Sequence, residues 1–289
     1  MARDPFFIPM LRGAEAPMIE VPSYAKINWA LRILGRRGDG YHDLETLFQT
    51  ISLHDTLTFR NASETTLVCD DPTIPIDETN LIMRAARAIG APPVAIELRK
   101  RIPAGGGLGG GSSNAATTLT TLNEMFQLGF RGDDLHSVAL GLGSDVPFFL
   151  VGGTAYATGR GEELAALPAV SGITLLLLLP DARVMTAAAF RLLRGFSPPM
   201  GLERFGEMTR DGLLRHASEL KNDFEIPVFQ QLPELAALKT RLQQQGAAWA
   251  AMSGSGSTMV GAFHDVATRD SALAKFIDVR CIVASTTEF

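Results

Sequence analysis

Pro103-Ala-Gly-Gly-Gly-Leu-Gly-Gly-Gly-Ser-Ser-Asn-Ala-Ala116 is the stretch of this sequence that decides the fold. Six glycines lie between Gly105 and Gly111, interrupted only by Leu108, and two serines and an asparagine follow them. Glycines let a backbone approach a bound group closely, and a helix N-terminus offers free N–H groups and positive partial charge. The stretch therefore predicts a loop that binds an anion, and nucleotide phosphates are the anion that it suits.

The segments on both sides of the glycine run carry regular patterns, which argues against a flexible linker. Before the run, residues 94–102 alternate in the manner of a half-buried strand, and Pro103 would end that strand. After the run, Leu119, Leu122 and Met125 recur at helical spacing, and Gly129 would end the helix. A strand, a glycine loop and a helix in this order favour an ordered anion-binding loop.

Two common nucleotide-binding loops do not fit the run. Gly105, Gly107 and Gly110 have the spacing of the dinucleotide fingerprint, but a run so dense in glycine matches it almost automatically. A Rossmann unit also needs a second strand that ends in an acid about 20 residues further on. Glu124, the nearest acid, lies within the predicted helix. The phosphate loop needs a lysine after its last glycine, and this run has none, so another class of nucleotide binder is indicated.

Composition narrows the class of protein further. The 289 residues suffice for two domains, and the net charge of -5 speaks against a general nucleic-acid binder. Cys69 and Cys281 provide neither a disulfide framework nor a zinc-ligand spacing, and they suit a reducing cytoplasm. The most apolar run, residues 173–179, is far too short to cross a bilayer. We therefore expect a cytoplasmic protein without nucleic-acid or membrane partners, in which residues 1–17 form a poorly ordered extension.

The pattern of strands and helices changes near residue 168. Residues 18–168 alternate strands and helices around the glycine run, whereas residues 169–289 follow a β-α-β-β-α-β order with extra helices. That second order is the ferredoxin-like pattern. The sequence thus predicts an α+β protein with an N-terminal α/β nucleotide-binding domain, a C-terminal ferredoxin-like domain and a ligand cleft between them.

Lys26 and Asn28 share one face of the first predicted strand, opposite Ile27 and Trp29. An ammonium and an amide on one face of a strand most often mark a solvated outer surface. The alternative is that both groups face a ligand, but the strand pattern taken alone favours the solvated surface.

Three further segments could carry chemistry. Asp145, between a glycine and an apolar Val-Pro-Phe-Phe run, is either a turn residue or a carboxylate placed beside a reacting hydroxyl. The segment 253–257, Ser-Gly-Ser-Gly-Ser, lies between two predicted strands, which favours a second phosphate or substrate loop over a nucleophilic serine. Tyr41 and His42 end a turn-like Gly-Asp-Gly-Tyr-His segment that, taken alone, could be a surface turn.

Taken together, three of these motifs resemble those of the GHMP small-molecule kinases. They are the segments 26–28 with 38–42, the stretch 103–116 and the late stretch 252–257, and in this order they span nearly the whole chain after residue 20. The glycine run, Gly143-Ser-Asp-Val-Pro-Phe-Phe149, Asp-Gly-Tyr-His at 39–42 and Leu220-Lys-Asn-Asp-Phe-Glu225 are similar to one branch of that superfamily. Members of the branch phosphorylate the 2-hydroxyl of 4-diphosphocytidyl-2-C-methyl-D-erythritol on the non-mevalonate route to isoprenoid precursors.

The resemblance implies a role for each matching residue. Asp145 would be the catalytic aspartate and Lys26 its partner lysine, while Asn28 and Thr186 would contact the substrate. Tyr41 and Phe190 would stack on its cytosine and His42 would hydrogen-bond to the base. ATP, with Mg²⁺ on its phosphates and with metal ligands that the sequence does not identify, would be held by Pro103, Ala104, Gly105, Gly106, Gly107, Leu108, Gly109, Gly110, Gly111, Ser112 and Ser113.

Two departures and three rivals accompany this hypothesis. Tyr24 stands where the family often has proline, and Ala187-Ala-Ala189 before Phe190 lacks the expected proline. The rivals are a kinase for homoserine, mevalonate or a sugar, a nucleotide-binding module without catalysis, and a Rossmann oxidoreductase. Tyr41 and His42 favour a substrate that carries a base, and Lys26 with Asp145 favours catalysis. We expect the chain to act as a monomer or a weak homodimer.

Overall fold

Two sheets form the framework of the computed structural model, which describes residues 18–288. The extension expected at residues 1–17 lies outside the described residues. In the first half the elements are β1 (Ile19–Arg36), β2 (His42–Asn61), β3 (Thr66–Cys69), α1 (Leu81–Ala88), β4 (Val94–Arg99), α2 (Gly110–Met125), α3 (Gly132–Leu142), α4 (Phe148–Val151), β5 (Thr154–Thr158) and β6 (Glu163–Ala166). In the second half they are β7 (Thr174–Leu179), α5 (Thr186–Leu192), α6 (Leu202–Asp211), the 3-10 turn η1 (Leu213–His216), α7 (Glu225–Gln231), α8 (Pro233–Gln244), β8 (Trp249–Met252), β9 (Met259–Phe263), α9 (Val266–Leu273) and β10 (Arg280–Ser285).

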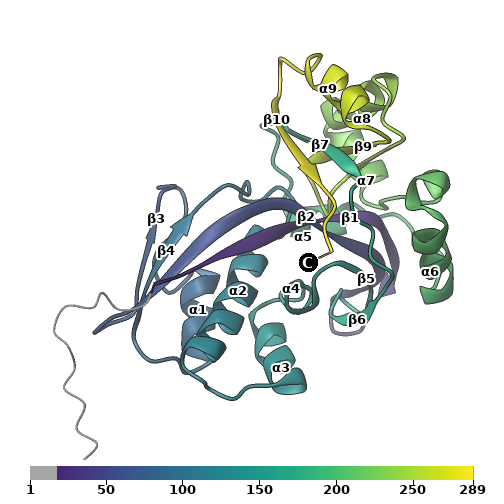
Figure 1. The fold of residues 1–289 in the computed structure, drawn as a ribbon. Coiled ribbons are helices and arrows are strands. Elements are labelled where there is room, and N and C mark those ends of the chain that lie inside the picture. The colour runs from purple at the N-terminus through teal and green to yellow at the C-terminus, as the bar shows by residue number, and fades with distance from the viewer. Residues whose placement is uncertain (1–17, 289) are drawn as a thin grey trace, which may run out of the picture.

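The first sheet has the order β3-β4-β2-β5-β6, and β1 pairs with β2 beside this path. Only β3 and β4 run parallel in this sheet, and its other pairs are antiparallel. Helices α1, α2 and α3 lie on one side of the long β1–β2 pair, and the second sheet lies on the other (Figure 1). Both faces of β1 are therefore covered, which explains why its central residues are buried on both faces.

A strand, the glycine loop and a helix follow one another as predicted, but the end of the strand and the start of the helix differ from the predicted positions. Strand β4 ends at Arg99, three residues before the predicted end at 102. The buried carboxylate of Asp55 is the cause, because it accepts hydrogen bonds from the backbone N–H groups of Arg101 and Ile102 at 2.7 and 2.8 Å. Helix α2 begins at Gly110, inside the run, and leads into α3 instead of a parallel strand. That topology removes the Rossmann alternative.

The second sheet is antiparallel, with the order β10-β7-β9-β8. Its chain order of strand, helices, two strands, helix and strand confirms the ferredoxin-like prediction. The predicted strand at 173–179, the helix that Pro233 begins and the pair of strands around the 253–257 loop are all present. No helix within residues 18–288 combines the length and the apolar character that a membrane span requires.

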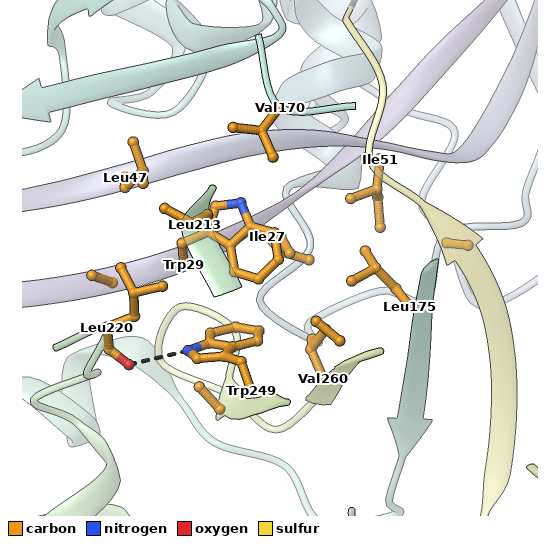
Figure 2. Close-up of a cluster of buried hydrophobic side chains, with 14 of the residues drawn as sticks. Ile27, Trp29, Leu47, Ile51, Val170, Leu175, Leu213, Leu220, Trp249 and Val260 are labelled. Carbon is orange, nitrogen blue, oxygen red and sulfur yellow. Dashed lines mark hydrogen bonds between the residues drawn. The ribbon is translucent and has the colours of Figure 1, made fainter. Parts of the chain in front are cut away.

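The two sheets share one apolar core. Ile27 and Trp29 of β1 pack in the same buried cluster as Leu175 of β7 and Trp249 of β8. The Trp29 and Trp249 rings lie with their centroids 4.7 Å apart, and the indole N–H of Trp249 donates to the carbonyl of Leu220 at 3.1 Å (Figure 2). This contact fixes the first sheet against the second, and so it fixes the walls of any cleft between them.

Candidate active site

A cavity of about 1070 Å³ is lined by residues from both halves of the chain. Its lining residues come from the β1–β2 pair, the glycine run, the turn before α4, the β5–β6 turn, α5 and the 253–257 loop. Many of the residues that the sequence singled out meet here. They are Lys26, Asn28, Tyr41, His42, Gly107, Gly109, Asp145, Thr186 and Phe190.

Lys26 is buried within β1, with only 4% of its side chain exposed. Its Nζ donates to Asn28 Oδ1 at 2.7 Å and lies 3.6 Å from Asp145 Oδ2. Burial lowers the pKa of Lys26 below its ordinary value of 10.5, and the Asp145 carboxylate opposes that shift by stabilising the ammonium. The solvated outer face that the strand pattern favoured is therefore wrong for Lys26 and Asn28, because the glycine run and the turn at Asp145 cover this face.

A chain of hydrogen bonds fixes the orientation of Asn28. Its amide nitrogen donates to Thr46 Oγ1 at 2.7 Å, and the Thr46 hydroxyl donates to the carbonyl of Ala30 at 2.6 Å. The amide oxygen is consequently the atom turned toward Lys26. Thr46, in β2, was not identified from the sequence, because its partners come from the neighbouring strand.

The glycines of the run meet different surroundings. A Cβ at Gly107 would lie 2.0 Å from the carbonyl oxygen of Ser253, and one at Gly109 would lie 2.7 Å from the Phe149 ring and 3.0 Å from Lys26 Cγ. A Cβ at Gly105 would meet nothing within 4 Å. Glycine is thus required at 107 and 109 by close packing against the protein itself, and the backbone at Gly105 is the part of the run that stays open.

Other residues of the run belong to the supporting structure. Leu108 is in the core, and its carbonyl accepts a hydrogen bond from the backbone N–H of Lys26 at 3.0 Å. Ser113 is buried, and its hydroxyl lies 2.7 Å from that of Ser23. The other residues predicted to form the phosphate loop are not among the residues that line the cavity: Pro103, Ala104, Gly105, Gly106, Gly110, Gly111 and Ser112.

The loop 253–257 is held against the glycine run. Ser253 Oγ donates to the carbonyl of Gly107 at 2.9 Å, and Ser255 Oγ lies 2.8 Å from Thr186 Oγ1 in α5. The buried amide of Asn222 donates to the carbonyls of Met252 and Gly254, both at 2.7 Å. Asn222 lies in the 220–225 segment whose resemblance was evident from sequence, but its role in holding this loop appears only in the structure.

Aromatic side chains gather at the end of the cavity away from the glycine run. The rings of His42 and Phe190 are stacked with centroids 4.7 Å apart and planes 19° from parallel. Tyr41 is 56% exposed, and the Arg160 guanidinium lies over its ring at 4.9 Å. Burial lowers the pKa of His42 from 6.5, and the nearby Arg36 guanidinium adds to the shift, so the imidazole is neutral at pH 7. Arg160 was missed from the sequence because nothing in its local pattern relates it to Tyr41.

The geometry can be compared with known proteins at this point. Family profiles described as the GHMP kinases N terminal domain and GHMP kinases C terminal match residues 80–153 and 202–278. A solved homoserine kinase from Cytophaga hutchinsonii superposes with a TM-score of 0.70 over 94% of this chain and 95% of that chain, at 18% identity, which supports the shared fold alone. The fold and the paired glycine loops thus define the class of protein as a GHMP kinase.

Closer relatives narrow the class. A 4-diphosphocytidyl-2-C-methyl-D-erythritol kinase from Chlorobium phaeobacteroides (strain BS1) is 41% identical over 94% of this chain and 98% of that relative. The crystal structure of a 4-(cytidine 5'-diphospho)-2C-methyl-D-erythritol kinase superposes with a TM-score of 0.79 at 34% identity, over 93% of this chain and 99% of that chain. The chain belongs to the 4-diphosphocytidyl-2-C-methyl-D-erythritol kinase family and is a small-molecule kinase.

Proposed function

We propose that the chain transfers the γ-phosphoryl group of ATP to the 2-hydroxyl of 4-diphosphocytidyl-2-C-methyl-D-erythritol, releasing ADP and the 2-phosphate. This is a step of the non-mevalonate route to isoprenoid precursors. One observation carries the proposal. A single cavity holds the Lys26–Asp145 ion pair, 3.6 Å apart, together with the aromatic cluster of Tyr41, His42 and Phe190. The ion pair suits a reacting hydroxyl, and the aromatic cluster suits a nucleobase.

The start of helix α2 supports a phosphate donor beside the ion pair. Its N-cap is Gly109, which has no side chain to cap the first backbone N–H groups, so these groups are available to an anion. The open backbone at Gly105 adds room for a ligand. The residues from Pro103 to Ser113 would hold the phosphates of ATP, and Mg²⁺ carried on those phosphates would offset their negative charge.

The ion pair then supplies the chemistry at the acceptor. In the proposed reaction the Asp145 carboxylate accepts the proton of the 2-hydroxyl group. At the same time, the oxygen of that hydroxyl group forms a bond to the γ-phosphorus. The bond between that phosphorus and the oxygen it shares with the β-phosphate breaks, and ADP leaves with the electron pair. The Lys26 ammonium, aimed by Asn28, stabilises the negative charge that develops on the attacking oxygen.

The aromatic cluster supports a cytosine-bearing acceptor. Stacking on an aromatic ring contributes about 1–3 kcal/mol per base, and the exposed Tyr41 ring offers such a surface. Stacking does not distinguish one base from another, so the neutral imidazole of His42 is proposed to hydrogen-bond to the base. Thr186, whose hydroxyl is fixed by Ser255, would contact the sugar portion of the substrate.

An assay of ATP consumption tests the proposal. The purified chain is offered the cytidyl substrate, homoserine and mevalonate in turn, and we expect ADP formation with the cytidyl substrate only. Asp145→Asn should lower kcat by about 10²–10⁴-fold with little change in substrate KM, because the amide keeps the shape but cannot accept the proton. ADP formation with homoserine or mevalonate alone would assign a different acceptor. Full activity of Asp145→Asn would remove the carboxylate from the mechanism.

A further inference from the structure

The cavity holds more positive than negative side chains. Lys26, Arg36, Arg160 and Arg191 line it, and Asp145 is the only carboxylate among its described lining residues. Lys26 pairs with Asp145, and Arg160 pairs at 3.3 Å with Glu162, which is not among the lining residues. Arg36 and Arg191 are exposed, whereas the Arg160 side chain is 31% exposed and fixed from behind. Arg160 is consequently the arginine that is best placed to bind a ligand at a defined position.

The protein holds Arg160 in a rigid turn between β5 and β6. Its flanking residues Gly159 and Gly161 both have positive φ, of 68° and 108°, and the carbonyl of Gly159 accepts a hydrogen bond from the N–H of Leu44 at 2.8 Å. The Glu162 carboxylate, 15% exposed, accepts hydrogen bonds from the backbone N–H of Arg160 at 2.5 Å and from its Nε at 3.3 Å. The Nε edge of the guanidinium is therefore hydrogen-bonded to Glu162.

The other edge of the guanidinium is available. Neither terminal nitrogen of Arg160 donates a hydrogen bond to another residue within the described part of the chain. The guanidinium lies over the Tyr41 ring, 4.9 Å from its centroid. A guanidinium with free terminal N–H groups in a partly desolvated cavity matches phosphate oxygens in geometry as well as in charge.

The position of Arg160 also matches the order of groups in the proposed substrate. Its side chain contacts Tyr41 at the nucleobase end, and the next residue in the chain, Gly161, has its Cβ position 3.9 Å from Asp145 Oδ1 at the reacting end. In a cytidine diphosphate ester, the diphosphate lies between the base and the alcohol that reacts. The turn that carries Arg160 therefore has Tyr41 on one side and Asp145 close to its next residue, along the path that the diphosphate must take.

We propose that Arg160 binds the diphosphate of the acceptor substrate and, through Glu162, fixes the distance between the base and the reacting hydroxyl. This assignment rests on the proposed function. The Arg160 guanidinium donates from its terminal nitrogens to the phosphate oxygens while its Nε stays on Glu162. Arg160 is thus a determinant of specificity for acceptors that carry an anionic bridge next to the base.

The test compares two probes that differ only in the diphosphate. Binding of CDP and of cytidine to the wild-type chain and to Arg160→Met is measured by calorimetry or by competitive inhibition. We expect the variant to weaken CDP binding by about 10- to 100-fold, the range expected for hydrogen bonds to a charged group, and to change cytidine binding by less than about twofold. The KM for the cytidyl substrate should rise by a similar factor, and the KM for ATP should stay near its wild-type value.

Arg84→Met is the matched control, because Arg84 is an exposed arginine of α1 outside the cavity and its loss changes the net charge equally. It should leave both probes unaffected. Equal weakening of CDP and cytidine by Arg160→Met would mean that Arg160 acts only by supporting Tyr41, and unchanged binding of both would mean that it contacts neither; either result overturns the assignment. Arg160→Gln, which keeps a donor for Glu162, replaces the methionine variant if that variant does not fold. Failure of the proposed function would appear separately, as wild-type enzyme that does not phosphorylate the cytidyl substrate.

Discussion

At the scale of single residues, burial of the Lys26 ammonium carries an electrostatic cost. Its ammonium is almost completely buried, and it has two polar partners, Asn28 at 2.7 Å and Asp145 at 3.6 Å. Asp145 is 37% exposed, so water weakens the attraction that would offset the burial. A lysine held in this way contributes positive charge to a reaction more than stability to the fold. Its position opposite Asp145 supports the catalytic role proposed for it.

Replacing this lysine should separate activity from stability. Lys26→Met should lower kcat by about 10²–10³-fold, because it removes the charge that is proposed to stabilise the attacking oxygen. The folded chain binds the proton of Lys26 less tightly than the unfolded chain, whose lysine has a pKa near 10.5. Between the folded pKa and 10.5 the unfolded state thus binds more protons, and wild-type stability rises with pH in that window.

The measurement is the free energy of unfolding in urea for both chains from pH 7 to pH 10.5. The stability of Lys26→Met relative to wild type should be greatest near pH 7 and should decline as the pH rises through that window. Other titrating groups are common to both chains and cancel in the difference. A difference that is constant with pH would show that burial does not perturb Lys26.

At the scale of elements, some glycines of the run allow close packing and another leaves open space, although all of them look alike in the sequence. Gly107 and Gly109 lack side chains because the 253–257 loop, Phe149 and Lys26 occupy the space, whereas Gly105 faces an open region. Packing at 107 joins the loop of the first half to the loop of the second half. The geometry of the loop that is proposed to bind phosphate consequently depends on a contact between residues 146 positions apart in sequence.

Two alanine substitutions distinguish these two kinds of glycine in the absence of nucleotide. Both Gly105 and Gly107 have positive φ, at 73° and 77°, so alanine at either position costs about 1–2 kcal/mol of backbone strain. Gly107→Ala also places a Cβ 2.0 Å from a backbone oxygen, so it should destabilise the chain by more than Gly105→Ala does. Urea unfolding of the two variants checks the order, and equal losses would refute the close contact with Ser253.

The same Gly107 variant should also raise the KM for ATP, because separating the two loops displaces the backbone that is proposed to bind phosphate. The KM for ATP reports on the geometry of the loop, whereas the unfolding experiment reports on the contact between Gly107 and Ser253. An unchanged KM together with lowered stability would place the phosphates elsewhere along the run.

At the scale of the whole molecule, the two halves are joined by a shared core. We propose residues 18–168 and 169–289 as the two domains, but the buried cluster that contains Ile27, Trp29, Leu175 and Trp249 belongs to both (Figure 2). Separating the halves would expose this cluster to water. The cavity that holds Lys26 and Asp145 is therefore kept in shape by a contact on the opposite face of β1.

The shared core predicts a single unfolding transition. The chain has two tryptophans, both in this core, so fluorescence reports on the junction while far-UV circular dichroism reports on every helix and strand. The two signals should give the same midpoint. Trp249→Ala should lower the free energy of unfolding by about 3–5 kcal/mol, and Trp249→Phe by less, because phenylalanine keeps an aromatic ring against Trp29.

Phe59→Leu provides the critical comparison. Phe59 is buried in a separate cluster beneath the first sheet, which contains neither tryptophan. In a cooperative molecule its loss of about 1–3 kcal/mol should shift the fluorescence midpoint as well. Different midpoints from the two signals in this variant would mean that the molecule does not unfold as one unit.

Local pattern alone determined the strand before the glycine run, the glycine loop at a helix start and the ferredoxin-like second half, because hydrophobic periodicity and glycine placement act over short segments. Motif resemblance added the pairing of Lys26 with Asp145. The tertiary structure decided the rest: that the polar face of β1 is buried, that Gly107 packs on Ser253, and that the Arg160 guanidinium lies over the Tyr41 ring. Each of these three features depends on contacts between segments that are far apart in the chain. The burial and the charge environment of a residue at such a contact depend on its neighbours in the folded structure, and no local sequence pattern encodes those neighbours.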